Sequence, residues 1–364
     1  MSTKKPQGTR LKKLFLNETL IVTVLSVILG LLVGAVVLAV AGYNPLEAYK
    51  MMLLGVVSKP KFIAQTIVYS MPVVLTGMSI AFAFRTGLFN IGAEGQFMIG
   101  AMTAAVLGYV LELPAVIHIP VVIIGSVVVS GLYGGLSGWL KARFGVHEVI
   151  STIMLNWFAL YFSNYIVYLP SLKNPGPEST YDIHESARLT IDSLKWLVGP
   201  GVKVSWGIPL ALVVVGIVAY YLFRTVQGFE LRAVGFNKEA ARYAGINVDA
   251  CVIKSMAIAG ALAGLAGALH VSGVSYHISK LAVSEGYGFN GIAVALIGNN
   301  SPIGVVLGGV LFSALNYGGT KMQSLQVPSE VVSIVIGAII FFIAIAKVFK
   351  PLLKPIQKYI AEEE

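Results

Sequence analysis

Long apolar runs separated by short polar segments form the main pattern of this chain. A run of about 20 apolar residues is long enough to cross the hydrocarbon core of a bilayer as a helix. The pattern therefore predicts an all-α, polytopic membrane protein. About ten transmembrane helices are expected, at residues 20–42, 62–84, 95–112, 114–140, 148–169, 204–223, 255–276, 285–300, 302–320 and 329–348.

The polar segments divide the chain further. A basic N-terminus (1–18) precedes a transmembrane domain (19–349), and a tail follows at 350–364. Lys and Arg gather in both terminal segments and in the loop 224–254, whereas the loop 171–203 carries four residues of each charge. By the positive-inside rule, the termini and 224–254 are expected in the cytoplasm and 171–203 outside. Residues 45–57, PLEAYKMMLLGVV, predict a short amphipathic helix at the membrane surface.

Composition excludes several classes of protein. Of 364 residues, 56% are hydrophobic and 12% charged, against about a quarter charged in soluble domains. The net charge of +9 lies at the ends of apolar runs, which fits membrane topology and not nucleic-acid binding. The single cysteine excludes a disulfide framework, and no phosphate-cradling G-x-x-x-x-G-K-[ST] motif occurs. We therefore expect no bound cofactor, no metal site and no enzyme activity in this chain.

One polar stretch interrupts the apolar pattern, FRTGLFNIGAEGQFMIGA at 84–101. Its glycines permit irregular backbone, which a membrane tolerates only where it faces protein or water. Asn90, Glu94 and Gln96 are therefore candidate residues of a substrate path, and the alternative is that they only join helices within the bundle. For Glu94 a structural or gating contact is favoured over contact with substrate, because a fixed carboxylate selects cations.

A second segment resembles the first. GYGFNGIAVALIGNN (286–300) repeats the Phe-Asn pair, so that Phe289 and Asn290 join the candidate path. The two copies enter predicted spans of opposite direction, which is typical of transporters with inverted repeats and broken or re-entrant helices. In HEVISTIMLNWFALYFSNYI, Thr152 and Asn156 share a helical face, with Trp157 beside them as a possible stacking surface. An interhelical hydrogen bond explains that face equally well.

The loop 224–254 contains KEAARYAGI, which predicts a short helix capped by Asn237 and ended by Gly245. Such a helix either covers the end of the bundle or docks into another protein. The charged residues Lys238, Glu239 and Arg242 are available for such contacts.

EAARYAG resembles the EAA-x-x-x-G coupling loop of ATP-binding cassette (ABC) importer permeases. Together with GLFNIGAEGQFMIGA and HEVISTIMLNW, it makes the chain similar to the ribose/branched-chain amino acid branch, and within it to permeases that serve nucleosides through a basic membrane protein-type lipoprotein. The resemblance implies a type II importer fold with about ten helices. It also implies that coupling to the ATPase involves a set of seven residues: Phe236, Lys238, Glu239, Ala240, Ala241, Arg242 and Gly245.

The same resemblance implies partners and a location. It implies an ATPase subunit that uses ATP-Mg, a second homologous permease subunit forming a heterodimer, an extracytoplasmic substrate-binding lipoprotein, and the lipid of a bacterial cell membrane. The expected substrates are nucleosides, with ribose-like sugars as the alternative. From another class, an ion-coupled secondary transporter would use Glu94 as a proton or cation site. A lipid-modifying enzyme is a third possibility, for which no residue set can be named.

Overall fold

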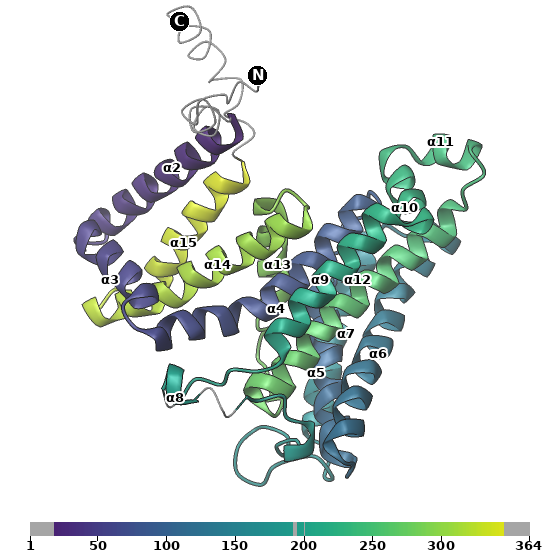
Figure 1. Ribbon diagram of the computed structural model, residues 1–364, viewed down its shortest axis with the longest axis horizontal. Helices are drawn as coiled ribbons and strands as arrows, with labels where there is room; N and C mark the ends of the chain where they lie inside the picture. The colour runs from purple at the N-terminus through teal and green to yellow at the C-terminus, as the bar shows by residue number, and fades with distance from the viewer. Residues whose placement is uncertain (1–17, 192–194, 200, 346–364) are drawn as a thin grey trace, which may run out of the picture. The chain divides into compact units, whose positions relative to one another are not determined.

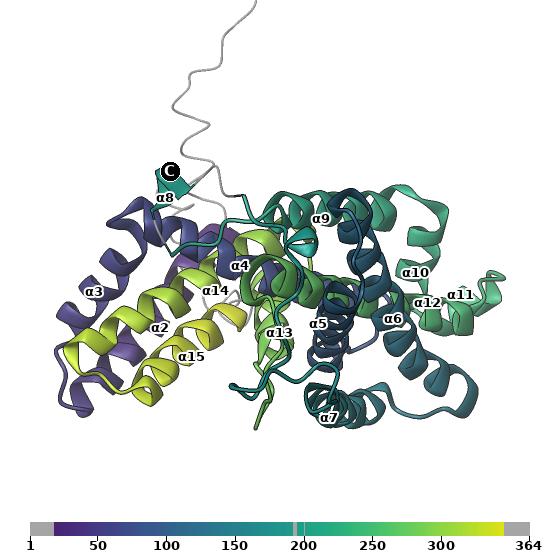
Figure 2. The same ribbon diagram turned by 90° about the horizontal axis from the view of Figure 1, so that it is seen from below.

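The computed structural model describes residues 18–191, 195–199 and 201–345 (Figures 1 and 2). Within these ranges the regular structure is helical, and only isolated β-bridges occur. The elements are α2 (Glu18–Val40), α3 (Pro45–Val57), α4 (Pro60–Arg85), α5 (Ala93–Val110), α6 (Ala115–Phe144), α7 (Glu148–Val167), η1 (Glu185–Ala187), α8 (Lys195–Val198), α9 (Gly207–Arg224), α10 (Val226–Phe236), α11 (Lys238–Tyr243), α12 (Val248–His270), η3 (Val271–Ser275), α13 (Tyr287–Ile297), α14 (Pro302–Met322), η4 (Gln323–Leu325) and α15 (Ser329–Ala344).

Six described helices are long and apolar enough to cross a membrane, namely α4, α6, α7, α9, α12 with η3, and α14 with η4. The pair α2 and α3, bent by 120°, makes a seventh if it counts as one span. The prediction of about ten spans is therefore not confirmed within the described ranges. The predicted tails at 1–18 and 350–364 lie outside those ranges, apart from Glu18 at the start of α2.

Three predicted spans fall short for physical reasons. α5 has 18 residues, but Glu94 and Gln96 in its first turns lower its mean hydropathy. α13 has only 11 residues, since Gly286 at φ 85° precedes it and Asn299 and Asn300 at positive φ follow it. α15 ends at Ala344 after 16 residues, and the last three residues of its predicted span lie outside the described ranges.

The contacts divide the chain into two compact units. One comprises Met1–Val56 and Leu315–Glu364, and within it α15 packs against α2. The other, Val57–Ala314, contains every candidate path and coupling residue. Its core is formed by α4, α5 and α12, whose residues are mostly buried.

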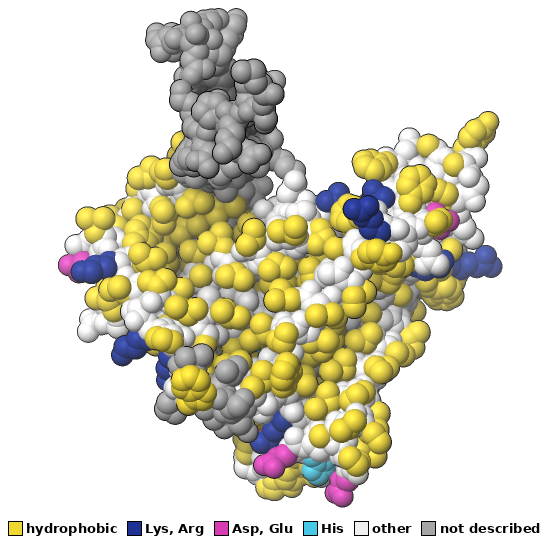
Figure 3. Space-filling view, in the orientation of Figure 1, with side chains coloured by type: hydrophobic (Ala, Val, Ile, Leu, Met, Phe, Trp, Pro, Cys, Tyr) yellow, Lys and Arg dark blue, Asp and Glu magenta, His cyan; other side chains and the backbone are white. Residues whose placement is uncertain are grey.

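Close approach of backbones holds the core of the second unit together. α12 packs against α4, α5 and α6. A methyl group on Gly100 of α5 would lie 2.1 Å from the carbonyl oxygen of Gly264 in α12, so only glycine fits. The outward faces of α6, α7 and α9 carry exposed apolar side chains, as a helix bundle in lipid requires. Apolar side chains cover most of the face in Figure 3.

Within the predicted outer loop, 171–203, a described part pairs with the segment that follows η3. Its backbone amides at Thr180 and Ile183 donate to the carbonyls of Ile278 and Tyr276, at 2.9 and 2.8 Å. Glu178 accepts hydrogen bonds from the Tyr168 hydroxyl and the Lys280 ammonium group, which lower the pKa of its carboxyl. The short elements η1 and α8 lie in this loop.

Candidate functional site

The polar stretch at 84–101 contains a break at residues 86–92 between α4 and α5, and the side-chain amides of the stretch pair with each other. The side-chain amide of Asn90 donates to the Ser79 hydroxyl at 3.2 Å and to the Gln96 carbonyl at 2.8 Å. The Gln96 amide donates back to the Asn90 carbonyl at 3.2 Å. Asn90 and Gln96 are buried, so this reciprocal pair satisfies polar groups that lipid and apolar side chains leave without partners.

Glu94 joins the start of α5 to the start of α13. One carboxylate oxygen accepts from the backbone amide of Gly286 at 2.7 Å. The other accepts from Gly288 at 2.5 Å and from Phe289 at 3.3 Å. A helix N-terminus has unsatisfied N–H groups and a partial positive charge, both of which a buried carboxylate complements. Glu94 is fully buried, and its contacts are to backbone and not to Arg85.

The backbones of α5 and α13 also lie in direct contact where Glu94 accepts these hydrogen bonds. A methyl group on Gly288 would lie 2.2 Å from the backbone nitrogen of Glu94. The Thr76 hydroxyl of α4 donates to the carbonyl oxygen of Tyr287 at 2.9 Å. The two similar segments, 84–101 and 286–300, therefore meet directly in the core of this unit.

Asn156 of α7 holds the same break from another side. Its carbonyl oxygen accepts from the backbone amide of Gly95 at 2.8 Å, and its amide donates to the carbonyl of Ile91 at 3.0 Å. Trp157, the next residue, points away from the break: it is 52% exposed and stacks on Tyr161. The structure thus brings Asn156 to the predicted cluster and leaves Trp157 on the outer face of α7.

The two asparagines of the similar segments have different surroundings. Asn90 precedes α5 and is buried with hydrogen-bond partners, whereas Asn290 lies within α13 and is only partly buried. Its side-chain amide makes no hydrogen bond with the described part of the chain. Phe289 beside it is exposed. Asn290 and Phe289 are therefore free to contact a solute. Asn90 could contact a solute only if its surroundings rearranged.

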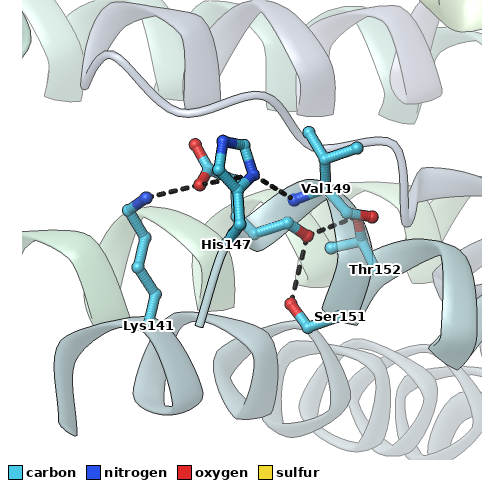
Figure 4. A network of polar contacts seen from close by, with 6 residues as sticks. Lys141, His147, Val149, Ser151 and Thr152 are labelled. Carbon is cyan, nitrogen blue, oxygen red and sulfur yellow. Dashed lines mark hydrogen bonds and ion pairs between the residues drawn. The ribbon is translucent and has the colours of Figure 1, made fainter. Parts of the chain in front are cut away.

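An ion pair joins the end of α6 to the start of α7 at the corner between these helices (Figure 4). Lys141 near the end of α6 pairs with Glu148, the first residue of α7. The Ser151 and Thr152 hydroxyls donate to the Glu148 carbonyl at 3.1 and 2.7 Å. Thr152 in turn packs on Gly92, so this corner positions α7 against the break at residues 86–92.

The predicted coupling residues lie at and after the end of α10. Asn237 caps α11 by accepting from the backbone amide of Ala240 at 3.0 Å, and Gly245 ends the segment at φ 82°. Ala241 is buried, and the other six predicted residues are exposed, namely Phe236, Lys238, Glu239, Ala240, Arg242 and Gly245. Figure 1 shows α11 projecting beyond the ends of α10 and α12.

Sequence reasoning missed several residues of this arrangement. Thr76 and Ser79 supply hydroxyls to the core from an otherwise apolar α4, and Gly288 allows the contact with Glu94. Tyr243, inside the quoted EAARYAG, is 97% exposed and extends the surface of α11. The available signal for Tyr243 was an aromatic residue within the charged segment KEAARYAGI. Nothing local marks Thr76 or Gly288, because their partners are distant in the sequence.

Residues 62–344 match the family described as "Branched-chain amino acid transport system / permease component". The chain belongs to this permease family. The match covers the break, the α6–α7 corner and the coupling segment, so the geometry above is that of a permease subunit. No solved structure matches the permease.

Similar permeases carry more specific names. The guanosine ABC transporter permease protein NupP of Bacillus subtilis is 42% identical over 89% of this chain and 93% of its own. The nucleoside ABC transporter permease protein NupB of Lactococcus lactis is 35% identical over 93% and 94%. The glucose ABC transporter permease protein TsgB13 of Haloferax volcanii is 31% identical over 90% and 87%.

Proposed function

We propose that this permease forms the translocation path for nucleosides in an ABC importer of the bacterial cell membrane. The observation that carries the proposal is the likeness to permeases named for guanosine and nucleosides, at 42% and 35% identity over most of both chains. Identity falls to 31% for the permease named for glucose, which makes hexoses and ribose-like sugars the second candidate class.

The energy source would be a separate ATPase that binds at α11. The exposed residues of α11, with Phe236 before it and Tyr243 at its end, give a projecting surface suited to a groove on a partner. The end of the bundle that carries α11 would then face the cytoplasm, and the loop 171–203 would face outward toward a substrate-binding lipoprotein. A second permease subunit, homologous but not identical, would complete the path.

The geometry of Glu94 favours this reading over an ion-coupled secondary transporter. Both carboxylate oxygens are engaged by backbone amides at the start of α13. A carboxylate that also bound a transported proton or cation would have to release those amides in every cycle, at a cost of about 1–3 kcal/mol for each buried group. Glu94 is therefore proposed to position α13, and Asn290 and Phe289 to contact the passing solute.

A competition assay tests the substrate class. Uptake of labelled guanosine by cells that express the assembled importer is measured with excess unlabelled nucleoside, ribose, glucose or leucine. The proposal expects competition by nucleosides alone. Absence of guanosine uptake, together with uptake of labelled ribose or glucose by the same cells, would replace the substrate class while leaving the ABC permease assignment intact.

A further inference from the structure

A cavity of about 290 Å³ opens at the end of the bundle where α4 and α10 end. Its walls include Arg85 from the last turn of α4, Arg232 and Phe236 from α10, and the turn at Asn299 and Asn300 before α14. Lys and Arg side chains gather beside α10 on the face in Figure 3. The path and coupling residues discussed above, apart from Phe236, do not line this cavity.

The two guanidinium groups are held in place on their inner edges. The Nε of Arg85 donates to the carbonyl of Asn300 at 3.0 Å, and the Nε of Arg232 donates to the carbonyl of Gly228 at 3.3 Å. Both guanidinium carbons lie over the ring of Phe223, at 5.5 and 5.3 Å from its centroid. These contacts leave the terminal nitrogens of both arginines as a rigid set of donors.

No negative charge compensates this pair in the described part of the chain. The cavity lining contains no Asp or Glu, and neither arginine forms an ion pair with a described residue. Two like charges over one ring repel each other, and partial burial strengthens that repulsion. A position near a helix C-terminus favours each cation singly but does not explain why both border the same cavity.

A further polar group at the cavity lacks a partner. The side-chain carbonyl oxygen of Asn300 is buried and makes no hydrogen bond with the described residues. Asn300 adopts φ 52°, a left-handed conformation that asparagine tolerates better than most residues. This oxygen accepts hydrogen bonds and does not donate them, so the arginines, and not Asn300, supply the donors for an anion.

Together, two preoriented arginines and a cavity lining without acidic groups match a phosphate group. Arginine binds phosphate through two parallel N–H···O bonds, and a dianionic or monoanionic phosphate would neutralise the repulsion between the pair. We propose that this cavity binds the phosphate of a small ligand, supplied either by the headgroup of an anionic phospholipid or by a free phosphate compound. The inference is independent of the transported substrate.

Thermal unfolding of the purified full-length chain in a neutral detergent tests the site. The unfolding midpoint is measured against dioctanoyl phosphatidylglycerol and, separately, inorganic phosphate, with chloride added to matched ionic strength. A binding ligand raises the midpoint in a saturable way. A response to the lipid alone identifies a headgroup site, and a response to phosphate identifies a site for a soluble phosphate compound.

Variants place the response at the cavity. In Arg232→Gln the half-saturating concentration should rise about tenfold or more, as expected for loss of a charged hydrogen-bond donor. Arg224→Gln removes an exposed arginine from the end of α9, outside the cavity lining, and should respond as the unchanged chain does. If Arg232→Gln does not fold, Arg232→Lys is used instead. It keeps the charge but loses the paired N–H donors of the guanidinium group, and should bind the probe several-fold more weakly than the unchanged chain does.

Two results would overturn the proposal. One is that neither probe shifts the unfolding midpoint beyond the shift given by chloride. The other is that the cavity variant, Arg232→Gln or Arg232→Lys, binds the probe as tightly as Arg224→Gln does. Uptake of substrate is not measured in this experiment, so its failure leaves the proposed transport function standing.

Discussion

At the scale of single residues, the chemistry of the break depends on how completely each polar group is paired. The side-chain amides of Asn90, Gln96 and Asn156 each donate one hydrogen bond or more and accept another. The Glu94 carboxylate accepts from three backbone amides. These groups therefore define the backbone path at 86–92 and the start of α13. The Asn290 side chain makes no hydrogen bond with the described residues, so it is available to contact a solute.

Glu94→Gln should lower the thermal unfolding midpoint of the purified chain and reduce uptake. The amide keeps one acceptor but turns an NH2 group toward backbone donors, at a cost of about 1–3 kcal/mol. Glu112→Gln, at an exposed position after α5, is the matched control and should change neither quantity. Normal stability and uptake in Glu94→Gln would remove Glu94 from the positioning role.

The asparagines should separate into two classes. Asn156→Leu leaves the Gly95 amide and the Ile91 carbonyl unpaired and should lower stability by about 1–3 kcal/mol per group. Asn290→Leu should leave the unfolding midpoint nearly unchanged and weaken uptake, because its amide is not used in folding. Equal loss of stability in both variants, measured by thermal unfolding, would contradict this division.

At the scale of elements, the meeting of α5 and α13 depends on a glycine. Gly288→Ala should destabilise the chain by about 1–3 kcal/mol, since its methyl group has no room beside the Glu94 nitrogen. Gly216→Ala, inside α9 with open space around the position, should be neutral or stabilising by about 0.5–1 kcal/mol. Thermal unfolding compares the two, and a neutral Gly288→Ala would mean that α13 moves away readily.

The surface of α11 gives a prediction about assembly. Tyr243→Ser should reduce the amount of ATPase that co-purifies with the permease, because an exposed aromatic side chain contributes heavily to an interface. The folding of the permease should be unaffected by this change, since the Tyr243 side chain is almost fully exposed. Trp206→Ser, an exposed aromatic at the start of α9, serves as the control and should retain the ATPase. Unchanged co-purification in Tyr243→Ser would remove this residue from the interface.

Sequence pattern located the elements unequally. The predicted spans lie within about four residues of α4, α6, α7, α9 and α14 at each end, because each run is continuous in hydropathy, whereas α12 begins at Val248, well before its predicted start. The run 285–300 reads as a span, yet its helix is short because left-handed residues stand at both ends. The sequence also singles out 84–101 as a candidate functional stretch, because polar groups in an apolar bundle need hydrogen-bond partners. Which partners they take depends on contacts such as Glu94 with Gly288, almost 200 positions apart, which no local signal encodes.

At the scale of the whole molecule, the chain is a subunit of the permease family. Family membership and the apolar helices make it a multi-pass membrane subunit. The proposed mechanism needs α11 to transmit movement from an ATPase to the core where α5 and α13 meet. α10 and α12 contact each other and flank α11, and α12 packs on α5, so the helices themselves supply a continuous route of contact.

The most direct test of this account is guanosine uptake into sealed proteoliposomes that contain the permease with its co-purified partners and binding protein. The account predicts accumulation of labelled guanosine when ATP is supplied on the side of α11. It predicts none with a non-hydrolysable ATP analogue or with a proton gradient alone. Uptake driven by the gradient in liposomes that contain only this chain would contradict the account and return Glu94 to consideration as an ion site.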